Sequence, residues 1–257
     1  MIRSIKYFIK RFYAYKKRGK VFKYIFLKIN KGYKIISTKN SQRRIKTFFN
    51  PAIFEYPIFD KSYEISISPQ NEILVDSYIN INSGTFIDVG AFIGKYTVKI
   101  GKKKNVRTVA IEPNPISFSI LLNNLKLNNI QENIVAINKA VSNTNDNKVN
   151  LIKNYAMSRI TKSEKNDVLL VQTTTLSKIV NEYNLHHPYF IKIDTEGHEW
   201  QIINSFGSGL NKNIPIELVI EILPDSDHKD RIIEFLHKRN FVYERIDFTN
   251  YYFKKIL

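Results

Sequence analysis

Short apolar runs alternate with amphipathic segments along most of this chain, and this alternation limits its fold more than any other feature. The apolar runs are too short for helices and are typical of buried strands, whereas the segments between them carry apolar residues at helical spacing. Strands that alternate with helices form a mostly parallel sheet with helices on both faces. The pattern therefore predicts an α/β fold of the Rossmann type.

The expected elements can be placed by residue number. Strands are expected at 85–89, 106–111, 134–137, 149–152, 189–193 and 216–220. Helices are expected after Gly94, after Pro115, and at 176–183, 199–205 and 228–238. Two final runs, 241–246 and 251–256, predict an antiparallel hairpin that closes the sheet.

Charge divides the chain unevenly. Residues 1–50 contain 16 Lys or Arg and no Asp or Glu, whereas residues 51–257 contain 24 basic and 23 acidic residues. Ile2, Ile5, Ile9 and Phe12 recur at helical spacing within the basic segment. We therefore expect a basic amphipathic helical extension over residues 1–50 and a separate α/β domain over residues 51–257.

Three interpretations of residues 1–50 stay open. The segment could be a helical lid that packs its apolar stripe on the body. It could lie on an anionic membrane surface, with aromatic residues in the interface and lysines on the head groups. It could also bind nucleic acid, although nucleic-acid arms need charge more than large apolar residues. We expect a cytoplasmic protein, held peripherally at the membrane if the second interpretation applies.

Composition excludes several classes of site. The chain has no cysteine, so it has no disulfide, no thiol nucleophile and no cysteine-ligated zinc or iron–sulfur centre. It also lacks a continuous apolar stretch long enough to span a membrane as a helix.

Acidic residues end four of the predicted strands: Asp88, Glu112, Asp194 and Glu221. In open α/β sheets, ligands bind beyond the carboxyl ends of the strands. Gly90 and Gly94 follow the first acid and allow the backbone to approach a ligand closely. A carboxylate at Glu112 can accept hydrogen bonds from both hydroxyls of a ribose. The first glycine of the dinucleotide motif is missing, so the pattern favours S-adenosylmethionine over NAD.

Three longer motifs resemble the FkbM family of S-adenosylmethionine-dependent methyltransferases. The first is Phe86-Ile-Asp-Val-Gly-Ala-Phe-Ile-Gly-Lys-Tyr-Thr97, and the second is Ala110-Ile-Glu-Pro-Asn-Pro115. The third, Phe190-Ile-Lys-Ile-Asp-Thr-Glu-Gly-His-Glu-Trp200, is the most distinctive. One departure is Phe92, where the family usually has Asn.

The resemblance implies a seven-stranded sheet and S-adenosylmethionine as the methyl donor. It places Asp88, Gly90 and Gly94 around the methionine part of the donor, Glu112 on the ribose and Asn114 near the adenine. Many relatives resemble O-methyltransferases of sugars or other hydroxyl-bearing metabolites, so the acceptor is expected to be a saccharide or another hydroxyl compound.

The catalytic candidates follow the strands nearest the expected methyl group. An alkyl hydroxyl needs a base to remove its proton, and Asp194, Glu196, His198 and Glu221 are the candidates. The alternative for Asp194 and Glu196 is that they stabilise the N-terminus of the next helix. The three carboxylates could also bind Mg²⁺, although we assign no metal ligand. Lys192 is expected to pair with one of these acids.

The sequence thus predicts an O-methyltransferase that acts on a saccharide or lipid-linked glycan. One alternative is an RNA methyltransferase that uses the basic segment to bind the polyanion. The other is a non-catalytic membrane or nucleic-acid adaptor with a degenerate methyltransferase fold.

Overall fold

The computed structural model describes residues 32–48, 51–69, 71–152, 160–161 and 168–257, which form two compact units. The units are Met1–Asn80 and Ile81–Leu257. The boundary predicted after residue 50 falls between β2 (Gln42–Thr47) and β3 (Ile53–Pro57), which pair as antiparallel strands. The division lies later than predicted because the β2–β3 ladder joins the residues on either side of position 50. The amphipathic helices expected within residues 1–29 lie outside the described residues.

The first unit contains a three-stranded antiparallel sheet in the order β1-β2-β3. A two-residue turn joins β1 (Tyr33–Lys39) to β2, and both of its residues, Asn40 and Ser41, have positive φ, as tight hairpins require. The helices α3 (Lys61–Ile67) and α4 (Ile73–Tyr78) follow β3. The helical extension predicted over residues 1–50 is therefore wrong for β1 and β2, which form an antiparallel hairpin instead.

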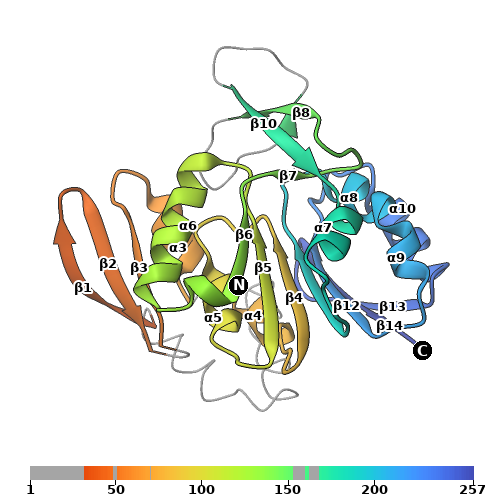
Figure 1. Cartoon of the computed structure of the whole chain (residues 1–257), viewed down its shortest axis with the longest axis horizontal. Helices are drawn as coiled ribbons and strands as arrows, with labels where there is room; N and C mark the ends of the chain where they lie inside the picture. The colour runs from red at the N-terminus through yellow and green to blue at the C-terminus, as the bar shows by residue number, and fades with distance from the viewer. Residues whose placement is uncertain (1–31, 49–50, 70, 153–159, 162–167) are drawn as a thin grey trace, which may run out of the picture. The chain divides into compact units, whose positions relative to one another are not determined.

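The second unit is built on a seven-stranded sheet in the order β13-β14-β12-β11-β4-β5-β6 (Figure 1). Five neighbouring strands, β12, β11, β4, β5 and β6, pair in parallel, and β14 pairs antiparallel with both β12 and β13. The predicted seven strands and closing hairpin are thus confirmed. The strands are β4 (Gly84–Val89), β5 (Val106–Ile111), β6 (Ile134–Ile137), β11 (Tyr189–Ile193), β12 (Ile216–Glu221), β13 (Phe241–Arg245) and β14 (Asn250–Lys255).

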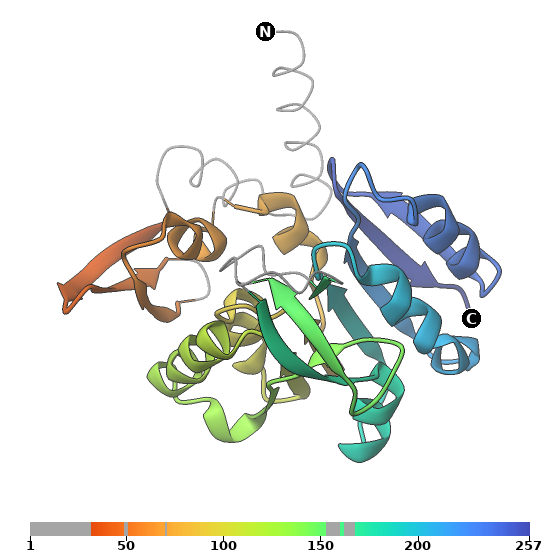
Figure 2. The same cartoon turned by 90° about the horizontal axis from the view of Figure 1, so that it is seen from above.

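Helices connect these strands close to the predicted positions. Asn114 caps α6 by accepting a hydrogen bond from the backbone amide of Ile116, and Pro115 occupies the first turn, where its missing N–H costs nothing. Figure 2 shows the dark-blue terminal strands beside α10. The helices are α5 (Lys95–Gly101), α6 (Pro115–Leu127), α7 (Leu176–Glu182), α8 (Glu199–Ser205), α9 (Gly207–Asn211) and α10 (Lys229–His237). Among the described helices, none is long and apolar enough to cross a membrane.

A smaller four-stranded sheet lies between β6 and β11 in the chain, in the order β7-β10-β8-β9. Its strands are β7 (Ala140–Val141), β8 (Lys148–Ile152), β9 (Ile160–Thr161) and β10 (Val168–Thr174). Figure 1 shows β7, β8 and β10 together at the top of the picture, beyond β6. The sequence predicted a strand near β8 but not β10, whose exposed Leu170 interrupts the apolar alternation.

The buried apolar side chains of the strands explain why the main sheet forms. Ile87, Ile191 and Ile220 come from three neighbouring strands, and all are fully buried. Burying one such side chain contributes roughly 1.5–3 kcal/mol. The polar residues that follow each strand therefore lie at the carboxyl edge of a rigid scaffold.

Candidate active site

The strand register brings the four predicted acids to one edge of the sheet. Val89 pairs with Ile111 on one side and with Ile193 on the other, and Ile193 pairs with Ile220. Glu112, Asp194 and Glu221 come directly after these paired residues, and Asp88 lies one residue before its own strand end. The predicted gathering of acids at the carboxyl edge is confirmed.

The turn after β4 is built on two glycines with positive φ, Gly90 and Gly94. A Cβ atom at Gly90 would lie 1.8 Å from the carbonyl oxygen of Asp194, so a side chain cannot fit there without moving the backbone. The sequence explained this glycine by the approach of a ligand, and the structure adds the approach of β11. Phe92 has a φ of 49°, the left-handed region that Asn tolerates better than an aromatic residue.

Asp88 is buried and holds the start of α5. Its Oδ2 accepts hydrogen bonds from the Thr97 backbone amide at 3.1 Å and from the Thr97 hydroxyl at 2.6 Å. Burial raises the pKa of Asp88, although the charge of Lys192 and the bonds from Thr97 oppose the shift. At least one carboxylate oxygen therefore supports the fold, and the predicted contact to the methionine part of the donor stays a prediction.

Glu112 accepts one backbone hydrogen bond on each of its carboxylate oxygens. The amide of Phe92 donates to Oε2 at 2.9 Å, and the amide of Asn114 donates to Oε1 at 2.8 Å. Each oxygen keeps a second lone pair, which suits two adjacent ribose hydroxyls. Burial raises the pKa of Glu112 to about 7, against the two backbone bonds that lower it. Asn114 is buried and uses its side-chain oxygen to cap α6, so its predicted contact to adenine is untested.

A second group of carboxylates lies where β11 and β12 end. Asp194, Glu196 and Glu221 each offer one oxygen, and these oxygens lie within 4.8 Å of one another. The buried ammonium of Lys192 contacts Asp194 Oδ2 at 2.6 Å, which confirms the predicted pairing. A divalent cation bound by the three carboxylates would compete with this ammonium.

Opposite pKa shifts distinguish two of these carboxylates. The charge of Asp194, followed by burial, raises the pKa of Glu221 far above its usual range. Burial would also raise the pKa of Asp194, but the Lys192 ammonium and the hydrogen bonds from Glu221 and Lys192 outweigh it and lower the pKa. Near neutral pH the pair therefore holds one proton, on Glu221, whose Oε1 also accepts a hydrogen bond from the Thr249 hydroxyl at 2.9 Å.

His198 lies beside the small sheet. Its Nε2 is 2.9 Å from the hydroxyl of Ser142, which follows β7. Burial lowers the pKa of His198 to about 4, so the ring is neutral near pH 7. This geometry favours a structural role that ties the small sheet to the loop before α8.

Thr97 and Thr249 contribute to the site but were not selected from the sequence. Each donates a hydroxyl to a predicted acid, Asp88 or Glu221. Thr97 is the last residue of the first motif, so its place in that motif could have identified it as a site residue. Thr249 comes from the closing hairpin, and no spacing in the sequence connects it to β12.

One protein family matches this chain. The model of the methyltransferase FkbM domain matches residues 88–243, more than half of the chain. No curated protein matches the sequence. Three solved structures illustrate the similarity. TYW2 of M. jannaschii in complex with AdoMet is 14% identical over 87% of this chain and 90% of that one, with a TM-score of 0.46. A putative rRNA-methylase from Clostridium thermocellum is 12% identical over 72% and 96% of the two chains, with a TM-score of 0.43. A precorrin-6y methyltransferase from Geobacter metallireducens is 14% identical over 74% and 89%, with a TM-score of 0.42.

The family match covers all four carboxylate-bearing strand ends and the glycine turn, from Asp88 through Glu221. This chain belongs to the FkbM family of S-adenosylmethionine-dependent methyltransferases.

Proposed function

We propose that this enzyme transfers a methyl group from S-adenosylmethionine to a hydroxyl of a saccharide or lipid-linked glycan, with Asp194 as the base. The observation that carries the proposal is the carboxylate group at the ends of β11 and β12. It combines an ionised acid, Asp194, with a protonated one, Glu221, at the edge where the ligand of such a sheet binds.

The residues at the ends of β4 and β5 fit the methyl donor. Gly90 and Gly94 supply positive φ angles that the turn requires, and Glu112 keeps a lone pair on each oxygen for the ribose hydroxyls. When bound, S-adenosylmethionine supplies an activated methyl group on a sulfonium. The neighbouring carboxylates lower the energy of that positive charge.

Asp194 would receive the hydroxyl proton. As the acceptor oxygen bonds to the methyl carbon, the carbon–sulfur bond breaks and its electron pair stays on sulfur. The hydroxyl proton passes to Asp194, which Lys192 holds in place. The protonated Glu221 donates a hydrogen bond to Asp194, so Glu221 and Lys192 together hold this carboxylate in place.

Asp194, Glu196 and Glu221 lie together at this edge, and the Lys192 ammonium is already paired with Asp194, which favours a neutral acceptor over the phosphates of RNA. The basic segment of residues 1–50 is the observation that keeps RNA methylation as a second candidate. Membership of a methyltransferase family argues against the non-catalytic adaptor.

The acceptor class can be tested with a radiolabelled methyl donor. The full chain is incubated with separated glycan, lipid and RNA fractions. We expect alkali-stable label in the glycan or glycolipid fraction, since a methyl ether resists alkali and a methyl ester does not. Label that ribonuclease releases would instead establish the RNA alternative.

The catalytic roles can be tested with three matched variants. Asp194→Asn is expected to reduce turnover about 100-fold or more while leaving donor binding nearly intact. Glu221→Gln keeps a hydrogen-bond donor beside an ionised Asp194, so we expect a loss of less than about tenfold. His198→Gln should change thermal stability more than turnover. Equal turnover in wild type and Asp194→Asn would remove Asp194 as the base.

A further inference from the structure

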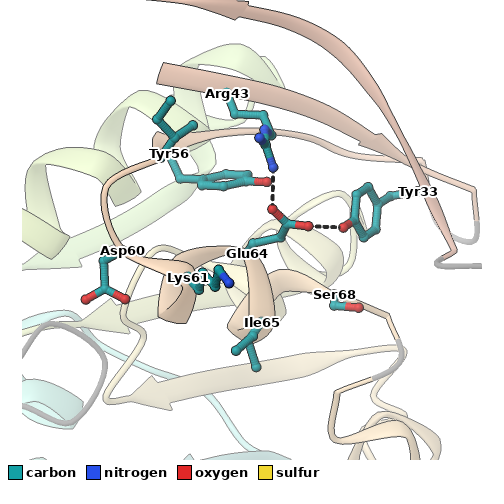
Figure 3. A pocket seen from close by; sticks show the side chains of 9 residues that line it. Tyr33, Arg43, Tyr56, Asp60, Lys61, Glu64, Ile65 and Ser68 are labelled. Carbon is teal, nitrogen blue, oxygen red and sulfur yellow. Dashed lines mark hydrogen bonds and ion pairs between the residues drawn. The ribbon is translucent and has the colours of Figure 1, made fainter. Parts of the chain in front are cut away.

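The first unit contains a cavity of about 370 Å³ that is lined entirely by its own residues. The lining comes from β1, β2, β3, the segment before α3, and α3 itself (Figure 3). The volume falls within the range of small-molecule sites, roughly 300–1,000 Å³. None of the residues assigned above to methyl transfer lines this cavity.

Glu64 lies at the centre of the polar lining. Tyr33 donates its hydroxyl to Glu64 Oε1, and Arg43 donates Nη1 to Oε2 at 2.5 Å. Figure 3 shows the Tyr33 and Tyr56 hydroxyls and the Arg43 guanidinium converging on this carboxylate. These contacts join two strands to α3 and hold the polar groups in a fixed arrangement.

Two buried donors in this cluster, the Tyr56 hydroxyl and Arg43 Nε, lack a well-formed hydrogen bond with the described residues, although the Tyr56 hydroxyl interacts with Arg43 and Glu64. Tyr56 is 1% exposed. The Tyr56 hydroxyl is close enough to its neighbours for burial and the Glu64 charge to raise its pKa to about 12, so it stays protonated. A buried donor without a partner costs stability, roughly 1–3 kcal/mol, unless a ligand or water satisfies it.

The charged side chains that line the cavity limit the kind of ligand that it can bind. Arg43 and Lys61 contribute two positive charges to the lining, and Asp60 and Glu64 contribute two negative ones. An anion would meet the two carboxylates, and a cation would meet the guanidinium and the ammonium. A purely apolar ligand would remove solvent from these charged groups and give them no hydrogen bond in return. A neutral ligand with several hydroxyls avoids all three penalties.

Hydroxyl groups also match the lining in hydrogen bonding. Each hydroxyl donates one hydrogen bond and accepts others, so it pairs best with a donor and an acceptor held side by side. Glu64 provides the acceptor, and Arg43 and Tyr56 provide donors next to it. We propose that this cavity binds a neutral saccharide through Tyr56, Arg43 and Glu64. The site rests on the cavity alone and does not depend on which molecule is methylated.

The test measures binding of defined sugars to the full chain by calorimetry and by saturation-transfer NMR. The probes are glucose, galactose, N-acetylglucosamine and maltose, with inorganic phosphate and glycine as charged comparators. We expect at least one neutral sugar to bind and neither charged probe to compete with it. Binding of phosphate alone, or of no probe at millimolar concentration, would overturn the proposal.

Tyr56→Phe removes only the hydroxyl that lacks a well-formed hydrogen bond, so this variant should fold at least as stably as wild type. Its sugar affinity should fall about fivefold, the effect of one lost hydrogen bond. Tyr63→Phe is the matched control, because Tyr63 is equally buried in the same unit but does not line the cavity. Equal affinity in both variants would place the sugar elsewhere and refute the assignment.

Two further variants separate this site from methyl transfer. Glu64→Gln leaves a net positive lining, so sugar affinity should fall and phosphate binding should emerge. Glu112→Ala should weaken donor binding more than tenfold and leave sugar binding unchanged. If Glu112→Ala removed the sugar signal, the sugar would be bound at the methyl-transfer site instead.

Discussion

Glu112 shows how one buried carboxylate can make donor binding depend on pH. Burial raises its pKa to about 7, so the protonated form is favoured in the folded protein. A folded-state pKa above the usual value means that this group favours folding at low pH and loses that contribution as the pH rises through about 7. Ribose hydroxyls donate to the ionised form, so ligand affinity should change in the opposite direction.

We expect the affinity for S-adenosylhomocysteine to rise between pH 5.5 and about 7 and then to level off. Calorimetry across pH 5.5–8.5 measures this directly. Glu112→Gln should bind more weakly by roughly 1.5–3 kcal/mol and lose the pH dependence. A wild-type affinity that stays constant over this range would show that Glu112 is ionised throughout or does not contact the ligand.

At the scale of elements, the turn after β4 and the end of β11 depend on each other. Gly90 donates its backbone amide to the carbonyl of Ile111, while its Cα faces the carbonyl of Asp194. Three strands therefore meet at one residue that has no side chain. The contact between Gly90 and the Asp194 carbonyl also fixes the position of Asp194, the proposed base, at the end of β11.

Gly90→Ala should destabilise the protein by roughly 2–4 kcal/mol, because the new methyl group would overlap the Asp194 carbonyl oxygen. Gly197→Ala is the matched control, since Gly197 also has positive φ but has nothing within 4 Å of the position of its Cβ. That control should cost only about 1 kcal/mol of backbone strain. Thermal unfolding of the two variants distinguishes atomic overlap at residue 90 from backbone strain alone. Similar melting temperatures would contradict the close approach of Gly90 to the Asp194 carbonyl.

At the scale of the whole molecule, the excess positive charge lies mainly in one of the two units. Residues 1–80 contain 17 basic and 5 acidic residues, and residues 81–257 contain 23 and 18. Most of the excess positive charge thus belongs to the first unit, which also exposes Ile35, Ile36, Phe59 and Ile65. We propose an anionic membrane surface as the partner of this unit, at about 1 kcal/mol for each basic residue near the lipid.

A chain that starts at residue 81 should fold, bind S-adenosylhomocysteine and fail to sediment with vesicles containing phosphatidylserine. The full chain should sediment, and rising salt should release it to the extent that charge dominates over apolar insertion. Binding to RNA is measured at the same ionic strength as binding to vesicles. This comparison distinguishes a preference for lipid from attraction to any polyanion. A full chain that ignores vesicles would exclude the membrane as the partner.

Much of the catalytic unit was predictable from the sequence by itself. Residues such as Ile87 and Ile191 belong to short apolar runs, and consecutive parallel strands place their carboxyl ends at one edge. Asp88, Glu112, Asp194 and Glu221 could therefore be grouped before any coordinates were known. Local periodicity determines such strand ends because it depends only on residues close together in the chain.

Only the tertiary structure decided how these groups interact. The proton on Glu221 depends on its distance from Asp194 across two neighbouring strands, and the His198–Ser142 contact joins residues 56 positions apart. The cavity around Glu64 likewise needs Tyr33 and Arg43 from separate strands of a sheet that the sequence did not predict. The protonation of Glu221, the close approach at Gly90 and the shape of the cavity all depend on distances between residues that are remote in sequence. The periodicity of apolar residues and the spacing of motifs reflect only residues close together in the chain, so they cannot predict those distances.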